Sequence, residues 1–560
     1  MQSFKGIRVS QIFIQIGLSG IFFYSILFII GSFFLLFGGS VHAGLFWVSA
    51  FVTAILVGLL GRKEQNYTEY FLGILGVFIL FSGVYVYQYG KLDVSYDGVS
   101  YHAQAVIEFL NGWNPYYYKL STETLHEIWL NHYPIASWLD AALLYAALPS
   151  FSGMKSFSMF LPLCAASFSI GVFKRIGFSW PIAILIGSIL GFNPVSIYEI
   201  QSLYLDGHIA AFWLFLIVLF IWRYRESTDY FFCGILLGSI TLIQLKFTGV
   251  VFVLMLLSMA SLAYFLLKRF ELILPILAAG FVTFTVGFWI LGYAPYVRNL
   301  SEHNHIFYPL MGEQSQAVDI MNNNPAYKYQ FGGHSTWYKF LKSYGSYCQH
   351  LNTEKDLEWR IPFATDAEEV HAWIPGGWIT AGFGPMFSGI LLVIIVLSVF
   401  QVVLNPNLYR YLLIAIFYLL CVLIVPENWL ARYVPYFWYF PWLILAFFWR
   451  NTSHIGLKII LFGTLIAGFW NIGHITEHSG KLQMWDENRW WSDYNKIGYD
   501  SYIYWGPFRA IEKRMQDHGI TFHSVNSKAE LPCNKEDMIP LGNIPGIWVC
   551  PQNKIKQPTQ

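Results

Sequence analysis

The first thirty residues, "MQSFKGIRVSQIFIQIGLSGIFFYSILFII" (residues 1–30), decide the fold class. A basic start is followed by an apolar run that is too long for the core of a signal peptide and has no clear cleavage site. About 20 mostly apolar residues are enough to cross a bilayer as one helix. The stretch therefore predicts a first membrane-spanning helix that the chain retains.

The composition of all 560 residues agrees with this prediction. Apolar residues make up 56% and charged residues 12%, with a mean hydropathy of +0.48, whereas an ordinary soluble domain carries about 25% charged residues. The net charge of +1 gives no reason to expect a nucleic-acid partner. Six scattered cysteines form no C-x-x-C pair, which argues against a zinc ribbon or a thioredoxin-like site. We expect an all-α polytopic protein whose partner is the lipid bilayer.

The length rule predicts about thirteen spans. They lie at residues 11–37, 42–60, 71–89, 153–173, 181–198, 207–222, 230–244, 248–267, 271–292, 384–404, 409–425, 434–449 and 455–473. The stretch 135–149 is either an interfacial helix or one more span.

The arginines and lysines of the short connections predict the orientation, because such loops stay in the cytoplasm. They recur at every other connection: Lys5, Arg8, Arg62, Lys63, Lys174, Arg175, Arg223, Arg225, Lys268, Arg269, Arg410 and Arg450. This places two long loops, 91–152 and 293–383, and the tail outside the cytoplasm. We expect a transmembrane domain at 1–476 and an extracytoplasmic domain at 477–560.

The tail has the pattern of a small α/β domain. "GPFRAIEKRMQDHG" (506–519) is typical of a helix, and "ITFHSV" (520–525) is typical of a strand. Cys533 and Cys550 lie in the oxidising compartment if the orientation is right, so a disulfide between them is one open alternative and two free thiols are the other.

The first outer loop contains "YDGVSYHAQAVIEFLNG" (96–112), where apolar residues from Val99 onward follow helical spacing. Asp97 at the start of this helix is either an N-cap or a general base held at the membrane surface, where apolar surroundings raise the proton affinity of a carboxylate. Asp93 is the alternative base. His102 lies five residues further on, as a structural hydrogen-bonding group or as part of the same cavity.

A second polar group interrupts "NPVSIYEIQSLYLDGHIAAF" (193–212), where Glu199, Asp206 and His208 stand in an apolar region. Charges near the apolar zone are costly, so they usually face a cavity or a partner, although an ordinary loop is the alternative. Lys246 in "LKFTGV" either binds a phosphate or extends its charge to the membrane surface.

Two arginines lie among aromatic residues at outer helix ends, Arg298 in "GYAPYVRNLSEHNHIFYPLMG" (292–312) and Arg432, next to Tyr433, in "ENWLARYVPYFWYFP" (427–441). Arginine binds phosphate through its planar fork. The aromatic residues suit sugar stacking or an interfacial belt. Carboxylates, cations and aromatics on one side of the membrane indicate group transfer from a lipid-linked phosphate donor. No P-loop, no G-x-G-x-x-G after a strand and no H-E-x-x-H is present.

At these residues the chain resembles the GT-C superfamily of integral membrane glycosyltransferases. "YDGVSYH" is similar to the D-x-x-x-Y-H element of the first outer loop in bacterial members. "NPV", "YLDGH", "LKFTG", "PYVRN", "HNHIFYPL", "GFGPMF" and "NWLARYVPYFWYFP" follow in the usual order between about 92 and 441. The pattern H-G-N-P-F-Y-P of the family is here "EHNHIFYP".

The resemblance implies an inverting transfer of a sugar from a polyprenyl-phosphate donor to a cell-envelope glycan or lipid acceptor, on the outer face of a bacterial inner membrane. Asp97 would be the base, and no metal or other cofactor is expected. The residues expected to bind substrate are Asp93, His102, Asp206, His208, Lys246, Arg298, His303, Arg432 and Tyr433, with Lys246, Arg298 or Arg432 on the phosphate.

Two other functions stay open at this point. A polymerase or ligase of lipid-linked oligosaccharides would share the outer site but take a pyrophosphate donor. A transporter of lipid-linked glycans would show repeat symmetry and charges at mid-membrane, which this chain does not display. The sequence leaves the role of 313–380 undecided.

Overall fold

The computed structural model describes residues 7–63, 66–312, 325–349, 356–366, 369, 379–405, 408–497, 500–541 and 546–555. It is 70% helical. Eight helical segments in these ranges are long and apolar enough to cross a membrane, by length and composition. They are α1 (Val9–Leu36), α2 (Ala43–Gly61), α3 (Tyr67–Tyr89), η2 with α7 (Gly153–Lys155 and Phe157–Arg175), α10 (Asp206–Arg225), α12 (Thr248–Leu266), η3 with α13 and η4 (Phe270–Leu272, Ile273–Thr283 and Phe284–Ile290), and α21 (Ile455–Ile497).

Five further apolar helices occupy the other predicted ranges and are shorter: α8 (Trp180–Gly191), α11 (Tyr230–Leu245), α18 (Phe387–Leu404), α19 (Tyr409–Leu423) and α20 (Tyr439–Asn451), the last preceded by η9 (Pro435–Trp438). The predicted span 181–198 is divided because Asn193 caps a new helix, α9 (Pro194–Glu199), by accepting from the backbone N–H of Val195. Proline at the first position of α9 has no N–H to continue α8.

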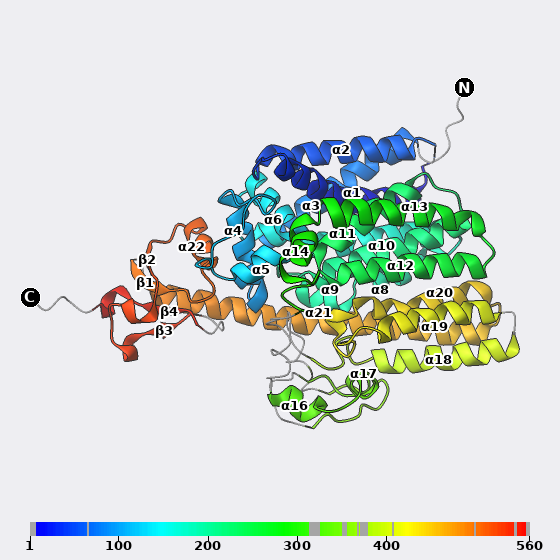
Figure 1. Cartoon of the computed structure of the whole chain (residues 1–560). Coiled ribbons are helices and arrows are strands. Elements are labelled where there is room, and N and C mark those ends of the chain that lie inside the picture. Colours follow the sequence, from blue (N-terminus) through cyan, green and yellow to red (C-terminus); the bar gives the residue numbers. More distant parts are fainter. Residues whose placement is uncertain are drawn as a thin grey trace, which may run out of the picture.

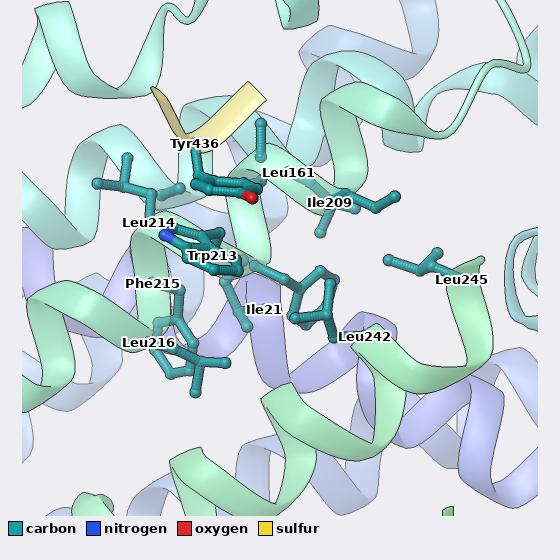
Figure 2. Packing of buried hydrophobic residues seen from close by; sticks show 14 of the residues in the cluster. Ile21, Leu161, Ile209, Trp213, Leu214, Phe215, Leu216, Leu242, Leu245 and Tyr436 are labelled. Atoms are coloured by element: carbon teal, nitrogen blue, oxygen red, sulfur yellow. The ribbon is translucent and has the colours of Figure 1, made fainter. Parts of the chain in front are cut away.

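The core of the bundle is built around α1 and α10. Helix α1 packs against α7, α3 and α2, and glycine makes the closest of these approaches possible. A Cβ added at Gly17 would lie 2.5 Å from the Cβ of Phe168 on α7. Figure 2 shows the packing around Trp213 of α10, whose ring stacks on Tyr436 of η9 with centroids 4.0 Å apart.

One end of the bundle carries the short helices that surround the candidate site. These are η1 (Gly98–His102), α4 (Ala103–Leu110), α5 (Glu127–His132), α6 (Ala136–Ala147), η5 (Tyr293–Arg298), α14 (Asn299–His303), α16 (Pro325–Phe331), α17 (Thr336–Gly345) and η8 (Ala431–Tyr433). The ambiguous stretch 135–149 is α6, which packs against α4, α1 and α2. Within the loop 313–380, residues 313–324, 350–355, 367–368 and 370–378 lie outside the described ranges.

The C-terminal segment forms a small α/β unit, as the sequence predicts. Strands β1 (Ser501–Tyr504), β2 (Phe522–Val525), β3 (Ile539–Pro540) and β4 (Trp548–Cys550) make a sheet of order β2-β1-β4-β3. The β1–β2 pair is parallel, with α22 (Ile511–Asp517) as its crossover, and the other pairs are antiparallel. Short turns η10 (Lys528–Glu530), η11 (Lys535–Asp537) and η12 (Gln552–Lys554) complete it. Cys533 and Cys550 are buried free thiols whose side chains interact.

The sheet is joined to the bundle by α21, which runs without interruption for 43 residues (Figure 1). The predicted domain boundary at residue 476 therefore falls inside a continuous helix. The first outer loop also packs on this segment, because Leu92 and Val99 share a buried core with Trp490, Trp505 and Phe508. The C-terminal unit thus shares its core with the loop that carries Asp97.

Candidate functional site

A buried ionic cluster of Asp206, Lys246 and Arg432 lies at the end of the bundle that carries the short helices. The Asp206 carboxylate accepts from Lys246 Nζ at 2.7 Å and from Arg432 Nε at 3.0 Å. The Asp206 side chain is 2% exposed, that of Lys246 17% and that of Arg432 10%. Asp206 begins α10, Lys246 lies in the break between α11 and α12, and Arg432 lies in η8. Three breaks in helical structure therefore bring together three residues distant in sequence.

Asp97 lies beside this ionic cluster. The Tyr204 hydroxyl accepts from the Asp97 backbone N–H at 3.4 Å, and the charges of Arg432 and Lys246 act on the Asp97 carboxylate. Burial raises the pKa of Asp97, although the charges of Arg432 and Lys246 oppose the shift. The capping alternative is wrong, because Asp97 has helical φ and ψ and its side chain makes no capping hydrogen bond. Its carboxylate is therefore available for another role.

Four tyrosines lie around the carboxylates of Asp97 and Asp206. The guanidinium of Arg432 lies 4.8 Å from the ring centroid of Tyr204 and 5.6 Å from that of Tyr433, and Lys246 Nζ lies 4.9 Å above Tyr433. The rings of Tyr101 and Tyr133 lie 6.3 Å apart, and Asp97 acts electrostatically on both hydroxyls. Cations over aromatic faces are favourable. These four rings lie around Asp97, Asp206 and the two cations, and we call this group of eight residues the recess.

Both carboxylate oxygens of Asp93, the other candidate base, accept hydrogen bonds from within the protein. Oδ1 accepts from the backbone N–H of Ser95 at 2.9 Å and from its hydroxyl at 2.6 Å, while Oδ2 accepts from the N–H of Leu203 at 2.8 Å. The residue is 3% exposed. This geometry is that of a side chain that shapes the loop, which leaves Asp97 as the carboxylate that faces Lys246 and Arg432.

His102 joins the recess as a neutral hydrogen-bond donor. Its Nδ1 accepts from Trp138 Nε1 at 2.7 Å, so the remaining ring nitrogen carries the proton. Burial, followed by the charge of Lys246, lowers the pKa of His102 to about 3. Its ring lies 4.2 Å from that of Tyr101.

The structure places His208 away from the recess. Its ring nitrogens face Tyr24 and Ser158, each at 3.3 Å, in the interior of the bundle. Two residues along a helix correspond to a rotation of about 200°, so His208 and Asp206 face opposite sides of α10. The geometry gives His208 a packing role between α1, α7 and α10.

A second group with Arg298 and His303 lies next to the recess. The ring of His303 stacks on Tyr308 at 3.6 Å, and Lys119 pairs with Glu302. Arg298 is 9% exposed, and its Nε and Nη2 have no hydrogen-bond partner among the described residues. A buried cation with unpaired donors is suited to an anionic ligand.

An aromatic layer separates this second group from the recess. Phe247 contacts Tyr133, with ring centroids 4.9 Å apart, and Phe307, at 5.8 Å.

Of the residues expected to bind substrate, the recess brings together Asp206, Lys246, Arg432, Tyr433 and His102. Arg298 and His303 adjoin it, whereas Asp93 and His208 face elsewhere.

The C-terminal segment fixes the backbone just before Asp97. Leu92 donates its N–H to Glu487 Oε1 at 2.9 Å and accepts from Gln483 Nε2 at 2.8 Å. Arg514 Nη2 donates to the Asp93 carbonyl at 2.7 Å, and burial lowers the pKa of Arg514 to about 10. Neither these residues nor Tyr133 could be recognised from the sequence, because each lies in a stretch with no functional motif of its own.

No family model, no curated protein and no solved structure matches this chain. In the part of the chain that the structure describes, no group of three or more His, Cys, Asp or Glu side chains is placed to hold a metal ion. The site is therefore interpreted from its own residues and geometry.

Proposed function

We propose that this chain is an inverting glycosyltransferase of the GT-C type, with thirteen spans. It transfers a sugar from a polyprenyl-phosphate donor to a glycan or lipid acceptor of the cell envelope. The observation that carries the proposal is the recess itself, where Asp97 lies beside Lys246 and Arg432 within tyrosine walls. A carboxylate with raised proton affinity next to two cations suits a base that works beside a phosphate leaving group.

In the proposed reaction, Asp97 accepts the proton of the acceptor hydroxyl while that oxygen forms a bond to the anomeric carbon of the sugar. The bond from this carbon to the phosphate oxygen breaks, and the electron pair leaves with the polyprenyl phosphate. Attack opposite to the leaving group inverts the anomeric configuration. Lys246 and Arg432 stabilise the charge that develops on the phosphate oxygen.

Asp206 orients the two cations in this scheme. Lys246 has three ammonium donors, and Asp206 holds one of them at 2.7 Å, which fixes the position of the charge before substrate binds. The same carboxylate also accepts from Arg432 Nε at 3.0 Å, so one side chain positions both cations. Pre-set dipoles and charges of this kind need no reorganisation during the reaction.

We propose that the site is extracytoplasmic in a bacterial inner membrane, and the distribution of arginine and lysine supports the orientation. The last turn of α10 carries Arg223 and Arg225, and the last turn of α7 carries Lys174 and Arg175. Asp206 begins α10 and therefore lies at its other end. Basic connections stay in the cytoplasm, so the recess faces the opposite compartment.

A donor panel tests the proposal. Purified protein is given monosaccharides linked to polyprenyl phosphate, oligosaccharides linked to polyprenyl pyrophosphate, and envelope acceptors, and the released lipid is identified by mass spectrometry. We expect release of polyprenyl phosphate from one monosaccharide donor. Turnover of the pyrophosphate-linked donors alone, or of none, contradicts the proposal, and the first of these outcomes favours the polymerase or ligase reaction.

A further inference from the structure

A cavity lies at the opposite end of the bundle from the recess. Its volume is about 300 Å³, and it lies between α10, α12, α19 and α20. Its walls are apolar and include Phe220, Ala260, Ala415 and Ile444. This volume is at the lower bound for ligand pockets, about 300 to 1,000 Å³. An apolar chain fits such walls, whereas a polar metabolite does not.

Packed aromatic side chains lie between this cavity and the recess. Tyr418 lines the cavity and donates its hydroxyl to the Tyr436 carbonyl at 2.6 Å. Tyr436 in turn stacks on Trp213 (Figure 2). The cavity is therefore a site of its own and not a part of the recess.

Two arginines, Arg225 and Arg450, line the cavity at the helix ends that carry the basic connections. Their charges act on each other, which is unfavourable for both. None of the described residues that line the cavity is an aspartate or a glutamate. The nearby Glu226 is engaged by Arg175, with Nε 2.6 Å from the carboxylate.

We propose that this cavity binds an anionic phospholipid of the leaflet at the basic end. The phosphate lies between Arg225 and Arg450, and one acyl chain fills the space between α10, α12, α19 and α20. The anion relieves the repulsion of the two guanidinium groups, and the chain contacts apolar walls that would otherwise lack neighbouring atoms.

A bound phospholipid would connect α19 and α20 to α10. Helix α20 follows η8 and η9, which carry Arg432 and Tyr436, so the lipid would stabilise the packing behind the recess. This inference does not depend on the glycosyltransferase proposal, because the lipid site is argued only from residues outside the recess.

Native mass spectrometry of the delipidated full-length protein in detergent tests the inference. The probes are phosphatidylglycerol and phosphatidylcholine with the same acyl chains, and the variant is Arg225→Gln/Arg450→Gln. Arg223→Gln is the matched control, since Arg223 belongs to the same last turn but is not among the residues that line the cavity. We expect wild type and control to prefer phosphatidylglycerol, and the double variant to lose roughly tenfold in affinity for it.

A second variant, Ala415→Phe, fills the cavity without changing charge. We expect it to bind less phosphatidylglycerol while the circular dichroism spectrum stays that of the wild type. Equal binding of both lipids by the wild-type protein overturns the inference. So does full retention of phosphatidylglycerol by the double variant and by Ala415→Phe.

Discussion

Replacing Asp206 by asparagine tests the ionic cluster, because this change keeps the shape of the side chain and removes its charge. Lys246 and Arg432 then face each other without the carboxylate that lies 2.7 and 3.0 Å from them. Both cations are mostly buried, so water compensates for only a part of the loss.

The expected cost follows from burial. Removing one partner of a buried ion pair costs about 3–5 kcal/mol, because the remaining charge is left uncompensated. The side chains of Lys246 and Arg432 are 17% and 10% exposed. Because water still reaches both cations, the expected cost is reduced to about 2–3 kcal/mol. In Asp206→Asn/Lys246→Met only one cation is left, so the two changes should couple by about 1 kcal/mol or more.

The free energy of unfolding is measured by titration with sodium dodecyl sulfate in mixed micelles, followed by tryptophan fluorescence. The matched control is Glu226→Gln at the other end of α10, where the Glu226 side chain is 35% exposed in its pair with Arg175 and the expected cost is below about 1 kcal/mol. If Asp206→Asn costs no more than this control, or if the double variant shows no coupling, the reasoning about the ionic cluster is refuted.

Three further predictions address the surroundings of the recess. Arg514→Met should lower kcat more than it raises KM, because Arg514 donates to the Asp93 carbonyl and so fixes the backbone just before Asp97. An unchanged kcat in transfer assays contradicts this prediction. The pKa of His102 is lowered to about 3 and that of His132 to about 4. Below about pH 6.5 these two histidines take up protons in the unfolded protein but not in the folded protein. We therefore expect the free energy of unfolding to have its full value above about pH 6.5 and to fall as the pH drops toward 4. The fall should be less steep in His102→Gln. Asp140 is fully buried with no hydrogen-bond partner for either carboxylate oxygen among the described residues, so Asp140→Leu should raise the free energy of unfolding by about 1–3 kcal/mol, and a loss in the same titration refutes this.

The helical architecture could be predicted from the sequence because apolar length is a local property. Each of the thirteen predicted ranges contains an apolar helix, and eight helical segments in the described ranges have the length and composition of a span. The division of 181–198 was not predicted, although Asn193 and Pro194 were visible. The continuity of α21 through residue 476 was also missed, because charged residues after the apolar run indicate the end of a span and not the end of a helix.

The candidate site could be predicted only where a polar residue stands out from an apolar context. Asp206, Lys246 and Arg432 have this property, and the fold brings them together. His208 has it too, but its direction on α10 is set by packing against Tyr24, which no local pattern reveals. Arg514 acts over a long separation in the chain, so only the folded structure relates it to the first outer loop.

The rate of sugar transfer by Asp97→Asn, compared with the wild-type protein and the donor identified from the panel, tests the central claim most directly. Loss of a general base lowers the rate by about 10²–10⁴-fold, and we expect this loss with an unchanged free energy of unfolding. An Asp97→Asn protein that transfers sugar at the wild-type rate would contradict the account, because the carboxylate in the recess would then take no part in the reaction.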